Sequence, residues 1–411
     1  MKATFTAADC ERCRLDFPSL ARTLDGRPLA FLDGPAGTQV PEAVIEAMSA
    51  YYRNANANTH GEFPTSRDTD RLLHETRETV AAFLGARSGR EVAFGQNMTT
   101  LTFALSHGLV RSMAPGDEIV VTQIDHEANR GPWLGLQERG IVIREAALRP
   151  CGRLDPDDLA RQITERTRLV AFNMASNALG TVGDAALARR LSKEVGAWLF
   201  LDAVHYAAHF PVDVAALDAD FLLCSAYKFY GPHVGILYAR PGLLEELRVD
   251  RLRTQEEEAP WRVEMGTLNH AALIGVKAAI DYIASWGTGG SERERIVSAM
   301  TAIAAYEHGL GAWYHGQVQR VPGVTVRGPD FSELRAPTVS ITIDGVRPID
   351  AARALGEKGI QVWDGNFYAI RPIEALGLAE RGGVLRTGIA MYNTREEIDR
   401  LLAGVAEIAG R

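Results

Sequence analysis

Short apolar runs alternate with segments of helical periodicity between about residues 90 and 240. The runs EVAFG, DEIVVTQ and RLVAFNMA each precede a helical pattern, and AWLFLDA, DFLLCSA and GILYA follow further along the chain. Such alternation predicts an α/β fold with a largely parallel sheet covered by helices on both faces. Ligands of open sheets of this kind bind at the carboxyl ends of the strands. The residues that directly follow each run are therefore candidates for a functional site.

The pattern changes after MGTLNHAALIGVKAAIDYIASWG. A long helical segment continues to about residue 315, and the pieces VTVRG, TVSITID, IQVWDG and GVLRTGIAMY then read as strands between helices. A chain of 411 residues is long enough for two domains. We predict an N-terminal segment over 1–28, a large domain over 29–270 and a smaller α+β domain over 271–411. The N-terminal segment is expected to pack with the small domain.

The charge and hydropathy of the chain argue against polyanionic and membrane partners. The formal net charge is −8, and no long run of lysines and arginines is present, so no nucleic-acid partner is expected. The first residues lack the continuous apolar segment of a signal peptide, and no stretch approaches the roughly 20 apolar residues of a membrane helix. We therefore expect a cytoplasmic protein with no membrane partner.

The four cysteines, Cys10, Cys13, Cys151 and Cys224, are too few and too scattered for a disulfide framework. Cys10 and Cys13 form a C-x-x-C motif, which would suit half a zinc site or a redox pair. No second pair completes a four-cysteine zinc site, and no strand precedes the motif as in a thioredoxin-like unit. We interpret them as two cysteines of a terminal segment and expect no metal.

Lys228 ends the apolar run FLLCSAY, an unusual place for a residue type that is rarely buried. The other lysines, Lys2, Lys193, Lys277 and Lys358, lie at the terminus, in helical patterns or in a polar turn. A partly desolvated lysine has a lowered pKa and can act as a nucleophilic amine that forms a Schiff base with a carbonyl. A strand-end lysine whose ammonium reaches water is the other interpretation, and this segment alone favours it.

The preceding run, AWLFLDA, delivers a single carboxylate, Asp202. A strand-end aspartate followed by a strand-end lysine fits a pyridoxal 5′-phosphate (PLP) site. In such a site the lysine holds the aldehyde carbon, and the aspartate keeps the ring nitrogen protonated. Asp202 could instead be the N-cap of a helix, which is the commoner fate of such a residue. The pair is suggestive and leaves both interpretations open.

For three further motifs, a functional role has to be weighed against a purely structural one. His126 follows DEIVVTQID, where it can stack on a cofactor ring and move protons or be an exposed loop histidine. His205 and His209 are four apart, but the glutamate of H-E-x-x-H and a third metal ligand are missing. In FGQNMTT, backbone N–H groups and the Thr99 hydroxyl can hold a phosphate or belong to an ordinary helix cap. Neither G-x-G-x-x-G nor G-x-x-x-x-G-K-[ST] occurs, which disfavours dinucleotide and P-loop sites.

Eight motifs, taken in order, resemble the class V aminotransferase family, most nearly its cysteine desulfurases and selenocysteine lyases. They span about residues 29 to 405 and read FLDGPAGTQVPEAV, EVAFGQNMTT, IDHEAN, NMASNALGT, LDAVHYAAH, LLCSAYKFYGPHVGILY, APWRVEMGTLNHAALIG and RTGIAMYNTREEIDRL. The resemblance implies a PLP-dependent enzyme of fold type I. Its large domain would hold a mostly parallel seven-stranded sheet flanked by helices, and its C-terminal domain would be a smaller α+β unit.

The resemblance also implies roles for residues of this chain. Lys228 matches the Schiff-base lysine, Asp202 the partner of the ring nitrogen, and His126 the residue that stacks on the ring and helps to move protons. The remaining cofactor-binding positions are Asn97, Met98, Thr99, His205, Ser225, Tyr227, Gly266 and Thr267.

Two pairs of residues in this resemblance imply what the site binds: a neighbouring subunit and an amino-acid substrate. Gly266 and Thr267 match a pair that reaches the phosphate of the neighbouring subunit, which implies a homodimer with its active site at the subunit interface. Asn177 and Arg386 match residues that orient a substrate carboxylate, so a small amino acid is the expected substrate. We also expect His60 to contact the substrate, since it lies in the loop NANTHGEF, which leaves the family pattern.

Three positions depart from the family pattern. His205 stands where the family has glutamine and Tyr227 where it has histidine, and both side chains still offer a hydrogen bond. Tyr368, in WDGNFYAI, stands where the desulfurases carry the cysteine that forms a persulfide. A phenol with a pKa near 10 cannot take sulfur from a substrate as a thiolate does. Cys224 lies inside an apolar run and the other cysteines are far away in sequence, so ordinary desulfurase chemistry is disfavoured.

These features lead to one functional hypothesis and two alternatives. We hypothesise a PLP-dependent C–S lyase that eliminates the β-substituent of a cysteine-derived amino acid, with Lys228 as the base for the Cα proton. Tyr368 and Asn366 would shape the leaving-group pocket. The first alternative is an aminotransferase or amino-acid epimerase with the same site. The second is a non-catalytic or sulfur-carrier scaffold, which the retained lysine, aspartate, histidine and arginine disfavour.

Overall fold

The computed structural model describes residues 4–410, and its large sheet has seven strands in the order β4-β10-β9-β8-β7-β5-β6. The strands are β4 Val92–Gly95, β5 Glu118–Thr122, β6 Val142–Ala146, β7 Thr167–Asn173, β8 Trp198–Asp202, β9 Phe221–Ser225 and β10 Gly235–Ala239. The five strands from β9 to β6 are parallel, whereas β10 runs antiparallel to both β9 and β4. The predicted mostly parallel seven-stranded sheet is confirmed.

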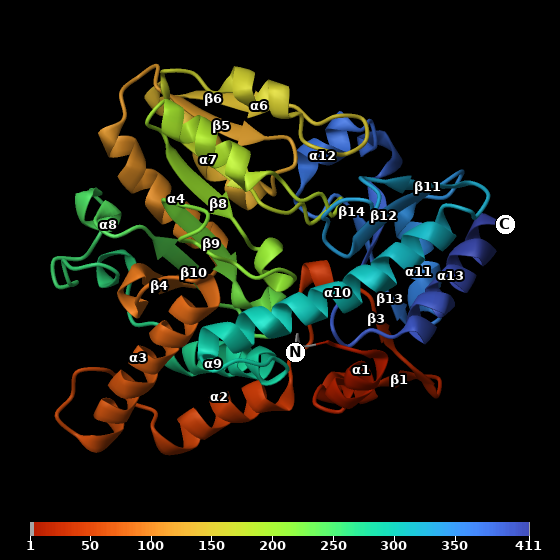
Figure 1. The fold of residues 1–411 in the computed structure, drawn as a ribbon, viewed down its shortest axis with the longest axis horizontal. Helices are drawn as coiled ribbons and strands as arrows, with labels where there is room; N and C mark the ends of the chain where they lie inside the picture. Colours follow the sequence, from red (N-terminus) through yellow and green to blue (C-terminus); the bar gives the residue numbers. More distant parts are fainter. Residues whose placement is uncertain (1–3, 411) are drawn as a thin grey trace.

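Helices cover both faces of this sheet, as Figure 1 shows. Successive residues of a strand point to opposite faces of the sheet. The apolar side chains of each strand therefore enter two separate cores in turn, one on each face. The helices of the large domain are α2 Glu42–Asn54, α3 Pro64–Leu84, α4 Met98–Leu109, α5 Gly131–Leu134, α6 Pro156–Gln162, α7 Ala185–Glu194, α8 Leu243–Glu246 and α9 His270–Ser285. The central strands are thereby shielded from water on both faces, and their ends are left for ligands.

A second, smaller sheet is antiparallel, with the order β11-β12-β15-β14. Its strands are β11 Val324–Arg327, β12 Thr338–Ile343, β14 Trp363–Gly365 and β15 Val384–Gly388. The helices of this part of the chain are α10 Glu292–Val318, α11 Pro348–Gly356, α12 Ile370–Ala375 and α13 Arg395–Ala409. Figure 1 shows α10 crossing from the large sheet to the small one, so that this helix packs with both. The predicted smaller α+β domain is confirmed.

The N-terminal segment lies beside the start of α13. It contains α1 Ala7–Arg14 and the short strands β1 Thr23–Leu24 and β2 Arg27–Pro28. Cys10 Sγ donates to the backbone oxygen of Asn393 at 3.3 Å, and the Arg14 guanidinium lies 3.0 Å from Glu397. The next strand, β3 Ala30–Phe31, pairs in parallel with β13 Ile360–Gln361 of the small domain.

The domain limits drawn from the sequence stay a prediction. Helix α9, which begins where the small domain was predicted to start, packs against α2 and α3 of the large domain. The predicted limits also include residues 1–3 and 411, which lie outside the described residues. Within residues 4–410, no helix combines the length and the apolar character needed to cross a bilayer.

A buried ion pair joins α3 to the edge of the large sheet. The guanidinium of Arg77 bonds both carboxylate oxygens of Glu264, at 2.8 and 2.7 Å, and also donates to the backbone oxygen of Val92. The backbone N–H of Phe94 donates to the same carboxylate at 2.8 Å. Only 9% and 7% of the two charged side chains are exposed. The pair therefore fixes the strand β4 and the segment that leads into residues 266–267.

Removing the cation of this pair should destabilise the fold strongly. Arg77→Met leaves the Glu264 carboxylate buried without its charged partner, which typically costs about 3–5 kcal/mol. The urea concentration at the midpoint of unfolding measures the effect. Arg190→Met is the matched control, because its ion pair with Glu194 is 61% and 56% exposed. Equal midpoints for the two variants would contradict this account.

Candidate active site

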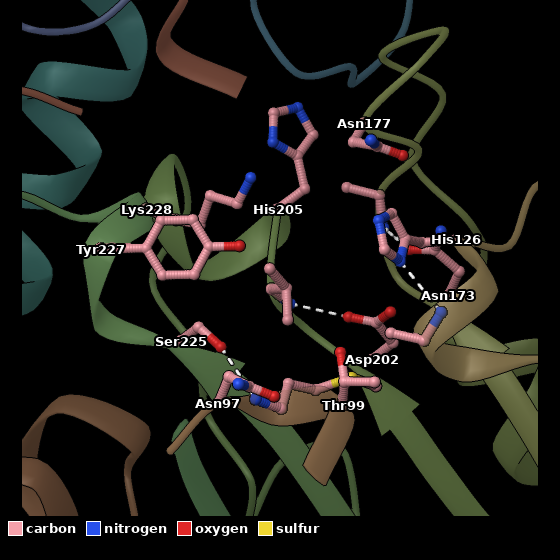
Figure 2. Close-up of a pocket in the computed structure, with 14 residues that line it drawn as sticks. Asn97, Thr99, His126, Asn173, Asn177, Asp202, His205, Ser225, Tyr227 and Lys228 are labelled. Atoms are coloured by element: carbon pink, nitrogen blue, oxygen red, sulfur yellow. Dashed lines mark hydrogen bonds between the residues drawn. The ribbon is translucent and has the colours of Figure 1, made fainter. Parts of the chain in front are cut away.

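The candidate active site is a cavity at the carboxyl ends of β5, β7, β8 and β9. Figure 2 shows side chains from separate stretches of the chain around it, with Lys228 and Tyr227 on one side and His126 and Asn177 on the other. The lining residues are Asn97, Met98, Thr99, His126, Ala128, Asn173, Ala175, Asn177, Asp202, Val204, His205, Ser225, Tyr227 and Lys228. The fold thus brings together most of the residues that the sequence marked as candidates.

Lys228 lies directly after β9, in a 3₁₀ turn, and only 8% of the residue is exposed. Its Nζ donates a hydrogen bond to the backbone oxygen of Pro35. Burial, helped by the positive charge of Arg386, lowers the pKa of Lys228 to about 7, and the Asp202 carboxylate opposes this shift. A large fraction of the amine is therefore neutral near pH 7, as a nucleophile requires. An ammonium that simply reaches water does not fit this burial.

Asp202 is the last residue of β8 and is buried at the base of the cavity (Figure 2). Its Oδ1 accepts a hydrogen bond from the backbone N–H of Val204 at 2.9 Å, so the carboxylate caps a turn and not a helix. Burial raises the pKa of Asp202 to about 6, while the Val204 N–H and the nearby Lys228 lower it in part. At neutral pH the side chain is mostly ionised, and it can pair with a protonated ring nitrogen.

His126 follows β5 and its ring faces the cavity from the side opposite Lys228 (Figure 2). Nδ1 accepts a hydrogen bond from the backbone N–H of Ala128 at 3.0 Å, so the ring hydrogen of the neutral form is on Nε2. Burial and the positive charges of Lys228 and Arg386 lower the pKa of His126 to about 4. A neutral, flat imidazole is therefore available to lie against a cofactor ring.

The first turn of α4 closes one end of the cavity. Asn97 is the N-cap, and its side chain accepts from the backbone N–H of Thr100 at 3.0 Å. Ser225 Oγ accepts from the backbone N–H of Met98 at 3.1 Å, and Thr99 lines the cavity. Capping therefore explains Asn97, while the helix N-terminus beside Thr99 offers the positive end of a helix dipole to an anion.

His205 and His209 bond different partners. His205 Nε2 lies 2.9 Å from Thr338 Oγ1, and its Nδ1 is buried without a hydrogen-bond partner. His209 Nδ1 lies 2.8 Å from a carboxylate oxygen of Glu307. Across residues 4–410, no group of three or more histidine, cysteine, aspartate or glutamate side chains is arranged to hold a metal ion.

Arg386, of the small domain, does not line the cavity itself but bonds Asn177, a residue of the cavity wall. It lies on β15, is 2% exposed, and donates from Nη1 to the backbone oxygen of Asn177 at 3.1 Å. The Asn177 side chain donates from Nδ2 to the backbone oxygen of Phe367 at 3.1 Å, which leaves its Oδ1 buried without a partner. Asn177 thus presents an acceptor to the cavity, and Arg386 supplies the donors that a carboxylate needs.

The other predicted residues lie outside this cavity. Gly266, Thr267 and His60 line a separate cavity beside α3. Tyr368 and Asn366 are exposed in the loop between β14 and α12, although the Tyr368 ring lies 5.8 Å from the His126 ring, measured between centroids. None of these five residues therefore lines the cavity of Lys228.

Asn173 is a lining residue that the sequence analysis missed. It ends β7, and its side chain donates to the backbone oxygen of Ile124 at 3.0 Å and accepts from the backbone N–H of Ala175 at 3.0 Å. The rule that marks Asp202, a polar side chain closing an apolar run, applies equally to Asn173 in RLVAFN. The run RLVAFN therefore predicts a polar group at this edge of the sheet as well.

An amine, a carboxylate and a helix N-terminus meet in this cavity, and that set of groups fits PLP. Lys228 can hold the aldehyde carbon, Asp202 can pair with the ring nitrogen, and the start of α4 can hold the phosphate. The unpartnered His205 Nδ1 and Asn177 Oδ1 offer further polar contacts, since buried polar atoms rarely stay without a partner. The fold and this site define a PLP-dependent enzyme of fold type I.

Comparisons with known proteins identify the family. The model for aminotransferase class-V matches residues 30–401. A cysteine desulfurase of Serratia proteamaculans and one of Salmonella agona are each 34% identical over 97% of this chain and 98% of their own length. The solved cysteine desulfurase of Thermococcus onnurineus superposes with a TM-score of 0.87 at 29% identity, and CsdA of Escherichia coli with 0.85 at 28%. Each of these two structures covers 97% of this chain, which covers 98% of each.

This chain therefore belongs to the class V aminotransferase family. It is a PLP-dependent enzyme that resembles the cysteine desulfurases, and the corresponding predictions are confirmed.

The lowered pKa of Lys228 predicts how uptake of the cofactor depends on pH. Only the neutral amine attacks the aldehyde, so the rate at which the cofactor-free protein gains visible absorbance should rise with pH and reach half its plateau near 7. Arg386→Met removes a positive charge, which raises the pKa of Lys228 and moves this midpoint to higher pH. The Lys228→Ala variant, which lacks the amine, gives the background absorbance of this assay. A wild-type midpoint near 10, the ordinary range of lysine, would contradict the buried-amine description.

Proposed function

We propose that this protein is a β-eliminating C–S lyase that acts on a cysteine-derived amino acid. The observation that carries the proposal is a cavity that fits PLP and whose lining residues include no cysteine. Cys10, Cys13 and Cys224 are buried elsewhere in the fold, and the exposed Cys151 lies outside this cavity. A reaction that uses no side-chain thiol therefore fits the site better than sulfur transfer to the protein.

The residues of the chain then have distinct tasks. Lys228 would hold the cofactor, Asp202 would keep its ring nitrogen protonated, and His126 would cover one face of its ring. When bound, PLP withdraws electrons from the substrate Cα and makes its hydrogen acidic. Lys228 Nζ, whose lowered pKa of about 7 leaves about half of the amine neutral at pH 7, can take that proton, while Arg386 would hold the substrate carboxylate.

Elimination requires no further nucleophile from the protein. Loss of the Cα proton and cleavage of the Cβ–S bond release a thiol, and the electron pair of the C–H bond forms a Cα–Cβ double bond. Hydrolysis of the remaining unsaturated amine by one water molecule gives pyruvate and ammonia. Tyr368 and Asn366, at the mouth of the site, would contact the departing group.

S-Methyl-L-cysteine should release pyruvate, ammonia and methanethiol in equal amounts. Lys228→Ala should lower the rate at least about 10³-fold, because the variant loses both the covalent anchor and the base. Pyruvate formation, followed by a coupled lactate dehydrogenase assay, is the measurement. Lys193→Ala is the control, since its amine lies on the surface and bonds Asp218. Exchange or racemisation at Cα without pyruvate, or activity that needs an added 2-oxo acid, would instead indicate an epimerase or an aminotransferase.

We also propose that the enzyme works as a homodimer. Gly266 and Thr267, matched to a pair that binds the phosphate of the neighbouring subunit, line a cavity separate from that of Lys228 in the same chain. This separation supports a contribution of the pair to a second copy.

Mixing two inactive variants tests the shared site. Thr267→Glu places a negative charge where the partner's cofactor phosphate would bind, and Lys228→Ala removes the amine. A mixed dimer contains one site with neither change, so random reassembly should restore about a quarter of wild-type activity. The rate of pyruvate formation after mixing is the measurement. A mixture as inactive as its two components, or a monomer by sedimentation, would contradict the proposal.

A further inference from the structure

Arg386 is a buried cation that lacks an anionic partner. Within residues 4–410 it forms no ion pair with a carboxylate, and its one hydrogen bond joins Nη1 to the backbone oxygen of Asn177. Guanidinium groups have five N–H donors, so most of the donors of Arg386 remain available. Burial of such a group is unfavourable unless other contacts compensate for the lost water. The surroundings of Arg386 therefore show what holds it in place.

The ring of Phe367 covers the guanidinium of Arg386. The guanidinium carbon lies 3.8 Å from the ring centroid, well within the range of cation–π contacts. The Phe367 side chain also packs against two apolar clusters, one that contains Ala178 and Leu179 of the large domain and one that contains Ile373 of the small domain. Phe367 therefore lies where the two domains meet.

The backbone that carries Phe367 has an unfavourable conformation. Phe367 and Tyr368 have φ values of 57° and 58°, in the left-handed region that bulky residues avoid. Three hydrogen bonds hold this loop: Asn177 Nδ2 donates to the Phe367 oxygen at 3.1 Å, the backbone N–H of Glu127 to the Tyr368 oxygen at 2.7 Å, and the Tyr368 N–H to Asn366 Oδ1 at 3.0 Å. Strain that the surroundings retain in this way marks a functional constraint.

An ion network fastens the segment that follows the loop. Arg371, on α12, bonds both carboxylate oxygens of Glu145 at 2.9 and 2.6 Å, and Arg130 bonds Glu145 at 2.5 Å. Both Glu145 and Arg130 belong to the large domain. The loop with Phe367 is thus tied to the large domain at Phe367 and Tyr368 and again at Arg371.

We propose that Phe367 is a positioning residue, whose ring fixes the plane of the Arg386 guanidinium so that its free N–H donors meet the substrate carboxylate. A stacked ring occupies the face of the guanidinium and leaves its edges open, and a carboxylate binds at an edge. Ring and carboxylate therefore do not compete. This inference rests on the proposed use of Arg386 by an amino-acid substrate.

Two probes separate this role from a general structural one. L-Alanine carries the carboxylate and ethylamine does not, and neither has a leaving group at Cβ, so binding is measured without elimination. Their dissociation constants come from the change in visible absorbance of the holoenzyme. In Phe367→Leu, which keeps an apolar side chain and loses the ring, we expect about tenfold weaker binding of L-alanine and less than about twofold change for ethylamine. Phe367→Tyr restores the ring and should bind both probes as the wild type does.

The controls address folding and specificity. Phe367→Gly adopts a φ of 57° without strain and should show the same selective loss as Phe367→Leu, even if the leucine variant folds poorly. Trp313→Leu removes a ring 3.5 Å from the guanidinium carbon of Arg395, outside the site, and should change neither constant. Equal losses for both probes in the Phe367 variants, or no loss for either, would overturn the proposal. Selective alanine binding without pyruvate release from S-methyl-L-cysteine would contradict the proposed lyase and leave the role of Phe367 supported.

Discussion

The active site depends on burying two cations without giving either a carboxylate partner at bonding distance. Lys228 and Arg386 are both nearly inaccessible, and burial lowers their pKa values to about 7 and about 9. Asp202 and Asp33, which oppose these shifts, have pKa values raised by burial to about 6. Because neither basic group is bonded to a carboxylate among residues 4–410, each can pair with a negative group that a ligand brings, such as a carboxylate. Burial is the largest cause of the lowered pKa of both Lys228 and His126, and the neighbouring positive charges lower each pKa further.

The site residues that the sequence predicts are those that a local pattern marks, a polar residue directly after an apolar run. A parallel sheet places the carboxyl ends of its strands at one edge, so a polar residue that closes an apolar run belongs to that edge wherever it occurs in the chain. This rule brings Asp202, His126 and Lys228 to one cavity, and the same rule applies to Asn173. The domain limits are harder to predict from the sequence, because helix α9 has the same apolar pattern whichever domain it packs against.

Contacts between distant segments could not be read from any local pattern. Arg386 meets the site through a backbone oxygen of Asn177, a residue about 200 positions earlier, and nothing in RTGIAMY indicates which backbone atom its guanidinium contacts. The left-handed conformations of Phe367 and Tyr368 are equally hidden, since neither residue favours positive φ. Tertiary contacts impose that conformation on the loop, and they become visible only when the two domains are assembled. The family resemblance supplied Arg386, but it could not supply Phe367, where this chain differs.

The loop around Tyr368 bears on the proposed chemistry in two ways. It is attached to the large domain, and it contains no cysteine. Enzymes that pass sulfur from a cysteine to an acceptor need that cysteine to reach both the substrate and the acceptor. In this chain the loop around Tyr368 is tied to the large domain by Asn177, Glu127 and the Arg371–Glu145 pair, and Tyr368 is 73% exposed. A fixed loop suits a reaction in which the leaving group departs directly into water, because no residue of the protein has to travel with it. Attachment of the loop and the absence of a cysteine from it thus both support the proposed elimination, for independent physical reasons.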